Sequence, residues 1–450
     1  MVWLIVLICA LLPAYQIRFK IGFLPLTLLE VLILICFFVW LLVKIKKSKL
    51  KPKTIDQTGG QDRQLLPKNW RSRPLSGPRF WSGWLILAWL VLGAAAIFIA
   101  PDLKVAAGIW KAYFLEPILF LIVLIDVVKT EKERNLVLGG LFFSAFYLSL
   151  AAIYQKFFGG AMHQTALGAG VMSQEVWGGP KVWRATSLFP QPNFLGLYLG
   201  PIVILAFGHL IFNLKKIHHS LFVVSYELLV ISLSLLAIVL ARSEGAIIGV
   251  FIGLIFFALF FSKTSRRISL VGLLILFLIV FIFSPSRDFL NKKISFHDLS
   301  GQLRLNIWQG AFSLFKTSPF LGVGLMGYQK LIPQYQKPYY SKTGELISVE
   351  THPYPHNLFL SIWFELGILG LIVFLWILIK FFKEGFKLIK KLEIRNLKLE
   401  IAIMASMITI IVHGLVDTPY FKNDLSVLFW LIIGLGMVEN QLSISDFVNE

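Results

Sequence analysis

Apolar stretches of about 20 residues recur along almost the whole chain, and each is long enough to cross the roughly 30 Å hydrocarbon core of a bilayer as a helix. Of the 450 residues, 57% are hydrophobic and 40 are Phe, whereas a soluble domain is typically about 45–50% apolar. A membrane β-barrel would instead require alternating segments of about ten residues, which the sequence lacks. The chain is therefore predicted to be an all-α, polytopic helical bundle in a membrane.

The apolar runs predict about twelve membrane spans. These cover residues 2–16, 21–43, 81–100, 105–128, 136–157, 194–214, 221–241, 246–262, 268–284, 357–381, 401–417 and 424–439.

Basic residues predict the orientation of these spans, because cytoplasmic loops carry an excess of Lys and Arg. The polar segment 44–80 and the loops near 129–134, 215–216, 263–267 and 380–398 are all basic. They fall on one side of the predicted topology, together with both termini, so that side is assigned to the cytoplasm. Arg18 and Lys20 are exceptions, since they follow the first span on the outer side. This topology explains the net charge of +19 without a nucleic-acid partner, and membrane lipids are the expected neighbours.

The first span resembles the apolar core of a signal peptide, but no basic segment precedes it and a second span follows at once. We expect an uncleaved helix.

The expected organisation has six parts. They are a transmembrane hairpin (1–43), a basic cytoplasmic linker (44–80), a transmembrane core (81–284), a large extracytoplasmic loop before the tenth span (285–356), C-terminal transmembrane helices (357–440) and a cytoplasmic tail (441–450). A loop as long as 285–356 in a chain otherwise trimmed to the bilayer favours a functional role.

Four basic residues are expected at the outer surface of the membrane, where an ionisable group is a candidate functional residue. They are Arg184, Arg242, Arg304 and His356. The guanidinium fork suits bidentate contacts to phosphate, and a lipid diphosphate would lie at this depth. Helix N-termini at Asn193 and Asn357 offer further backbone donors for an anion.

Structural roles compete with this interpretation. Arg184 and Arg242 could serve as interfacial anchors whose charges reach the headgroups. Arg304 lies in a stretch that places Leu305, Trp308, Phe312 and Phe315 on one helical face, typical of an amphipathic interfacial helix.

Several carboxylates could orient His356 or act as a base in its place. Glu244, Glu350, Glu365 and Asp417 all qualify, and the sequence does not choose among them. Asp, Glu and His form no cluster with metal-ligand spacing, and Cys9 and Cys36 lie within apolar runs. No metal and no cofactor are therefore expected. If a diphosphate leaves at this site, Arg would have to stabilise the charge that develops on it.

Four sequence segments resemble motifs of the O-antigen ligase and polymerase family of bacterial membrane glycosyltransferases. His356 and Asn357 are followed by nine residues, Gly367, two residues and Gly370, which fits the family pattern without a gap. The stretch RLNIWQGAFSLFKTSPFLGVGLMGY, which begins at Arg304, resembles the family's loop segment ending in a Pro-x-x-Gly-x-Gly turn. The stretch RATSLFPQPNFLG, which begins at Arg184, resembles an earlier segment, and Arg242-Ser243 resembles the family's Arg after a central span. The long basic linker is atypical.

The resemblance implies a GT-C-like fold and an enzyme in the bacterial plasma membrane. Such an enzyme transfers an undecaprenyl-diphosphate-linked glycan to a glycan, lipid or protein acceptor on the extracytoplasmic face, without a nucleotide sugar or metal. His356 would be the catalytic or acceptor-positioning residue. Arg184, Arg242 and Arg304 would bind the donor diphosphate, with Asn193, Asn357, Glu350 and Glu365 in supporting positions.

Other function classes remain open at this stage. Ligation to a lipopolysaccharide core and polymerisation of repeat units differ in the acceptor, which one sequence does not reveal. A lipid-linked glycan transporter or flippase would carry charges within its spans and inverted repeats, whereas the charges here gather in outer loops. A glycan polymerase of the peptidoglycan type shares the many-helix plan, but the His-Asn-x9-Gly pattern argues against it.

Overall fold

The computed structural model describes most of the chain, in several segments. The described residues are 1–22, 24–50, 83–158, 173–175, 182–214, 221–282, 284–285, 287–288, 291, 295–296, 299–336, 339–340, 346–348, 354–391 and 397–449. Most of the predicted linker, and the candidate residue Glu350, lie outside them.

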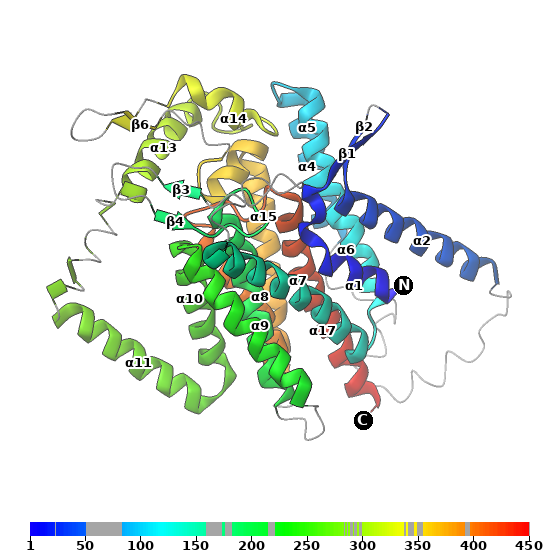
Figure 1. Cartoon of the computed structure of the whole chain (residues 1–450). Helices are drawn as coiled ribbons and strands as arrows, with labels where there is room; N and C mark the ends of the chain where they lie inside the picture. Colours follow the sequence, from blue (N-terminus) through cyan, green and yellow to red (C-terminus); the bar gives the residue numbers. More distant parts are fainter. Residues whose placement is uncertain are drawn as a thin grey trace.

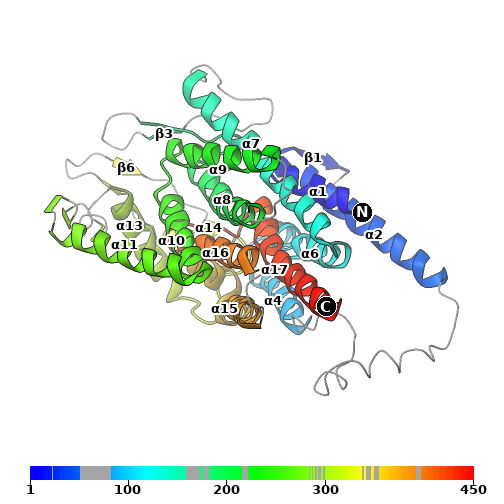
Figure 2. The same cartoon turned by 90° about the horizontal axis from the view of Figure 1, so that it is seen from below.

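Long helices run side by side in one bundle (Figure 1). Its centre is formed by α8 (Pro192–Asn213), α16 (Leu397–His413) and α17 (Asn423–Asn449), whose side chains are largely buried. Around them stand α4 (Gly83–Ile99), α6 (Glu116–Val127), α7 (Glu131–Phe158), α9 (Leu221–Leu240), α10 (Glu244–Phe261) and α15 (Leu358–Lys391). The view along the bundle places α2 (Leu28–Leu50) and α11 (Lys263–Ile282) at opposite edges (Figure 2).

Eight helical segments among the described residues are long and apolar enough to cross a membrane. They are Leu28–Lys47, Leu103–Val127, Glu131–Phe158, Pro192–Asn213, Val223–Leu240, Glu244–Phe261, Leu358–Lys390 and Asn423–Leu442. Two apolar helices, Gly83–Ile99 and Leu399–His413, are shorter. These helices confirm the prediction of an all-α polytopic membrane protein.

The N-terminal segment differs from the predicted first span. α1 (Val2–Ala10) has only nine residues, and a 3-10 helix follows over Leu12–Gln16. Pro13 lies in the first turn of that 3-10 helix, and proline cannot supply the backbone donor that would continue α1. A short hairpin then pairs β1 (Arg18–Ile21) with β2 (Leu24–Thr27) at one end of the bundle.

A π-helical turn over Lys111–Leu115 joins α5 (Leu103–Trp110) to α6 within one predicted span. Pro117 explains it, because a proline ring clashes with the carbonyl four residues earlier, at Tyr113, and offers no N–H to it. That carbonyl accepts a hydrogen bond from the Tyr420 hydroxyl instead, at 2.8 Å. The indole nitrogens of Trp89 and Trp430 donate to the same hydroxyl, at 3.0 and 3.1 Å. This buried group ties α4, the π-turn and α17 together.

The large predicted loop contains α13 (Leu299–Phe315), α14 (Gly327–Leu331), a 3-10 turn (Ile332–Gln334), and the short strands β5 (Tyr339–Tyr340) and β6 (Leu346–Ser348). The inner face of α13 is formed by Ile307, Ala311 and Leu314, which are buried. Leu305 and Phe312, which belong to the predicted apolar stripe, are instead exposed (38% and 61%). Phe315 of the same stripe packs against Trp363 and Phe364, and Trp308 donates to Pro355 O, so only part of the predicted stripe faces away from the protein core.

The loop segment with the Pro-x-x-Gly-x-Gly turn contacts the segment that follows His356 at a kink in α15. Gly367 has φ 71° and ψ −174°, so the helix is broken there. Backbone groups around the break pair with the loop: Val323 N–H donates to Phe364 O (2.7 Å), and Ile368 N–H donates to Phe320 O (2.9 Å). A Cβ on Gly367 would overlap the Phe320 carbonyl oxygen. The break at Gly367 thus lets backbone hydrogen bonds hold the loop against the helix that begins after His356.

Candidate functional site

A network of side-chain contacts connects three of the predicted site residues, Arg184, Asn193 and His356, through Asp417. Arg184 Nη2 donates to Asn193 Oδ1 (2.8 Å), and Asn193 Nδ2 donates to Asp417 Oδ2 (2.9 Å). Asp417 Oδ1 lies 3.3 Å from His356 Nδ1. Arg184 and Asn193 are close in sequence, but His356 and Asp417 are far from them and from each other, so the fold itself assembles this network.

Arg184 ends the short strand β4 (Val182–Arg184), which pairs with β3 (Ser173–Glu175). Its Nε donates to Ala241 O (2.8 Å) and its Nη2 to Arg242 O (3.3 Å), both in the turn between α9 and α10. The guanidinium is therefore fixed by backbone carbonyls on one side and by Asn193 on the other. Asn193 follows Pro192, the first residue of α8, a position that favours proline.

His356 precedes α15 in a conformation that few non-glycine residues adopt, with φ 47°. The flanking backbone is fixed: Trp308 Nε1 donates to Pro355 O (2.9 Å), and Leu358 N–H donates to Gly414 O (2.7 Å). Asn357 caps α15 by accepting Leu360 N–H (3.0 Å), and it also donates to Leu415 O (3.0 Å). Strain held in place by the surrounding contacts is typical of functional sites.

Asp417 stays ionised although its side chain is buried. Burial alone would raise the pKa of this carboxyl, but the hydrogen bonds from His356 and from Thr418 N–H (2.8 Å) hold the pKa well below its usual range. An imidazole that presents Nδ1–H to a carboxylate carries its lone pair on Nε2. The pair therefore sets His356 up to accept a proton at Nε2.

The other predicted residues lie at different places relative to this network of side chains. Arg304, on α13, donates from Nε to Val416 O (3.3 Å), beside Asp417. Arg242 has φ 48° and an exposed side chain, in the turn whose carbonyls hold Arg184. Glu365 is fully buried in α15 and accepts Met326 N–H, so it fastens the loop rather than orienting His356.

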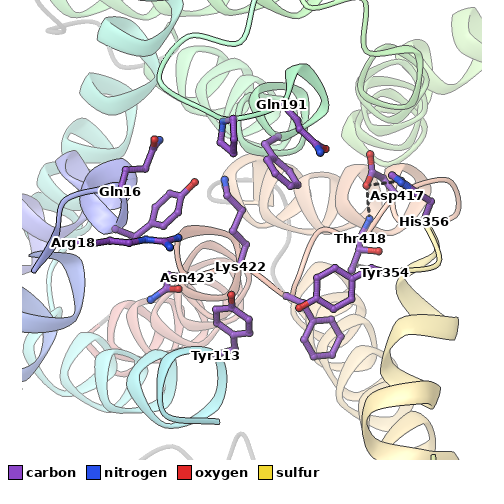
Figure 3. Close-up of a pocket in the computed structure, with 14 residues that line it drawn as sticks. Gln16, Arg18, Tyr113, Gln191, Tyr354, His356, Asp417, Thr418, Lys422 and Asn423 are labelled. Carbon is purple, nitrogen blue, oxygen red and sulfur yellow. Dashed lines mark hydrogen bonds and ion pairs between the residues drawn. The ribbon is translucent and has the colours of Figure 1, made fainter. Parts of the chain in front are cut away.

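A cavity of about 460 Å³ opens beside His356 and Asp417 (Figure 3). It is lined by Tyr15, Gln16, Arg18, Tyr113, Pro190, Gln191, Phe194, Tyr354, His356, Asp417, Thr418, Phe421, Lys422 and Asn423. Within the described part of the chain, Arg184, Arg242 and Arg304 are not among the lining residues.

Sequence reasoning left two cationic lining residues, Arg18 and Lys422, out of the site. Arg18 had one visible signal, its place on the side of the topology that carries few basic residues. Lys422 follows the eleventh predicted span on that same side.

No group of three or more His, Cys, Asp or Glu residues that could hold a metal ion occurs in the described segments.

The comparison with protein families bears on the same region. Residues 229–375 match the family model of the O-antigen ligase. The resemblance drawn from the motifs is confirmed over this segment, which contains Arg242, Arg304, His356 and Glu365. No curated protein matches the chain. The O-antigen ligase segment and the apolar helices together support a bacterial membrane protein of ligase or polymerase type, a glycosyltransferase-like enzyme in polysaccharide biosynthesis.

Proposed function

We propose that the chain transfers a glycan from undecaprenyl diphosphate to a hydroxyl group of an acceptor at the extracytoplasmic face of the bacterial plasma membrane. The observation that carries the proposal is the His356–Asp417 pair at the cavity, connected through Asn193 to Arg184. This arrangement couples a proton acceptor to a guanidinium suited to a diphosphate.

In the proposed reaction, the acceptor hydroxyl attacks the anomeric carbon of the glycan. The bond from that carbon to the diphosphate oxygen breaks, and the diphosphate leaves with the electron pair. His356 Nε2 takes the hydroxyl proton, and the negative charge of Asp417 stabilises the imidazolium that forms. Arg184, Arg242 and Arg304 would hold the diphosphate and offset its developing charge.

Reconstitution tests this proposal. Purified protein in liposomes would be given undecaprenyl-diphosphate-linked oligosaccharides and candidate acceptors, and the products would be sized by mass spectrometry. A ladder of longer lipid-linked glycans would identify a polymerase. One glycan block on a new lipid or protein would identify a ligase. Movement of intact donor across the bilayer without transfer would favour a flippase and contradict the proposal.

The variant His356→Gln separates proton transfer from positioning. Glutamine still offers hydrogen bonds to an acceptor but takes no proton, so turnover should fall by about 10²–10⁴-fold if His356 is the base. His209→Gln is the matched control, because it breaks another His–carboxylate pair, with Glu227 at 2.6 Å, nearer the opposite end of α8. Near-normal turnover of His356→Gln would restrict His356 to positioning.

A further inference from the structure

The cavity extends from His356 to a wall of hydrogen-bond donors provided mainly by the N-terminal segment. Figure 3 shows Arg18 and Gln16 on one side of the cavity and His356 on the other, with Lys422 between the two sides. Most of this wall comes from residues outside the segment that matches the O-antigen ligase model.

Two buried polar atoms in this wall lack partners. Among the residues that the structure describes, Tyr15 Oη and Gln16 Nε2 have no hydrogen-bond partner. Tyr15 is only 4% exposed, and a buried donor without an acceptor is costly. Both residues line the cavity, so a ligand there that accepts hydrogen bonds would offer these donors a partner.

Lys422 is held next to these donors. Its ammonium nitrogen lies 3.2 Å from Asp424 Oδ2 and faces the rings of Tyr15, Phe189 and Phe194, 4.1 to 4.6 Å from their centroids. Such contacts favour the charged form of a buried ammonium and fix its position. Arg18 adds a second cation with an exposed side chain. Arg18 and Lys422 are thus the two cations that line this end of the cavity.

The hairpin that carries Arg18 is fastened to the bundle. Thr27 and Glu30 form a reciprocal capping pair at the start of α2 (Thr27 N–H to Glu30 Oε2, 2.8 Å; Glu30 N–H to Thr27 Oγ1, 3.2 Å). Glu30 also accepts hydrogen bonds from Lys111 (3.2 Å) and from the lining residue Asn423 (3.3 Å). The cationic wall is therefore built into the fold.

Aromatic side chains line the space between this wall and His356. Tyr354 stacks on Phe421 with ring centroids 5.3 Å apart, and Tyr113 meets Phe421 edge to face at 6.4 Å. Flat apolar rings beside polar donors suit a sugar, which has both an apolar face and hydroxyl groups.

We propose that the end of the cavity formed by Tyr15, Gln16, Arg18 and Lys422 binds an anionic group, a phosphate or carboxylate, on a sugar acceptor whose hydroxyl lies at His356. This inference rests on the proposed transferase function and adds the chemical class of its acceptor. The acceptor is assigned here, rather than the donor diphosphate, because the three arginines predicted to bind the diphosphate lie outside the cavity lining.

Acceptor kinetics test the assignment. Two oligosaccharide acceptors that differ by one phosphate would be compared at saturating donor. Arg18→Gln and Tyr15→Phe should raise KM for the phosphorylated acceptor, by about tenfold for the arginine, the scale of one charge-assisted hydrogen bond. KM for the neutral acceptor and for the donor should change little. Lys20→Gln is the matched control, because Lys20 is exposed on the same hairpin and does not line the cavity.

A binding measurement separates this inference from the transferase proposal. Glucose 1-phosphate should raise the melting temperature of the purified protein more than glucose does, in wild type and in His356→Gln, and Arg18→Gln should abolish the difference. That result supports the subsite even if no transfer is found. Equal acceptor KM values in Arg18→Gln and wild type would overturn the inference while leaving the transferase intact. A stabilisation that Arg304→Gln removes and Arg18→Gln keeps would place the phosphate at the predicted donor arginines and also overturn it.

Discussion

The substitution Asp417→Asn removes one negative charge from the candidate site with almost no change in size. Asp417 Oδ1 faces His356 Nδ1 at 3.3 Å and accepts Thr418 N–H at 2.8 Å, while Oδ2 accepts Asn193 Nδ2 at 2.9 Å. An amide has one acceptor oxygen and two N–H donors. At least one of these contacts must therefore become a donor facing a donor.

The expected effect on turnover follows from the His356–Asp417 distance. Two unit charges 3.3 Å apart interact by about 5 kcal/mol at an effective dielectric constant of about 20. The His356 side chain is 22% exposed, and we discount the value by about half for screening by water, to about 2–3 kcal/mol. The charge of Asp417 acts when His356 becomes protonated in the transition state, so turnover should fall by about 30–150-fold.

Single-turnover transfer in liposomes, with the donor preloaded, measures this loss. The melting temperature should shift by only a few degrees, because one hydrogen bond contributes about 1 kcal/mol. Asp126→Asn is the matched control: this carboxylate also accepts two side-chain hydrogen bonds, from Trp40 and Lys44 at 2.7 Å each, near the end of α6. Turnover within about threefold of wild type would refute the proposed role of the pair.

Three further predictions concern other parts of the molecule. Gly367→Ala should destabilise the protein by at least about 2 kcal/mol, seen as a lower melting temperature, because its Cβ would overlap the Phe320 carbonyl oxygen at a positive φ. Arg184→Lys keeps the charge but loses the fork, so donor KM should rise several-fold at unchanged stability; an unchanged KM would exclude a diphosphate role. Burial lowers the pKa of Lys422 from 10.5 to about 8, although the charge of Asp424 acts in the opposite direction. Binding of an anionic acceptor should therefore weaken as the pH rises above about 8, while the stability of the protein rises between about pH 8 and 10.5. An acceptor KM that does not change with pH over this range would contradict the prediction.

The sequence was sufficient to predict the membrane bundle and the location of several site residues. Apolar run length reports the helices directly, and prolines and asparagines mark where α8 and α15 begin. Asn193 lies nine positions after Arg184, at the start of a helix, so the two residues can meet through a local turn of the backbone. His356 lies where a polar loop meets a span, which the pattern of hydropathy reveals.

The partner of His356 was not predictable in the same way. Glu244, Glu350, Glu365 and Asp417 were all candidates, and the choice depends on the turn after α16, which brings residues 414–418 beside residues 356–358. Such long-range packing leaves no local pattern. The N-terminal wall of the cavity was missed for a related reason, because an expected long span ends at Ala10 and gives way to a hairpin.

The hydrogen-bonded side chains from Arg184 through Asn193 and Asp417 to His356 form a relay, which has a consequence for how donor binding and acceptor binding affect each other. Its first member would contact the donor diphosphate, and its last would receive the acceptor proton. Any movement of the guanidinium toward a bound diphosphate therefore alters the amide that holds the carboxylate, and through it the imidazole. Coupling of this kind is reciprocal, so a bound donor should tighten acceptor binding and a bound acceptor should tighten donor binding. The KM of each substrate should therefore fall when the other substrate is saturating.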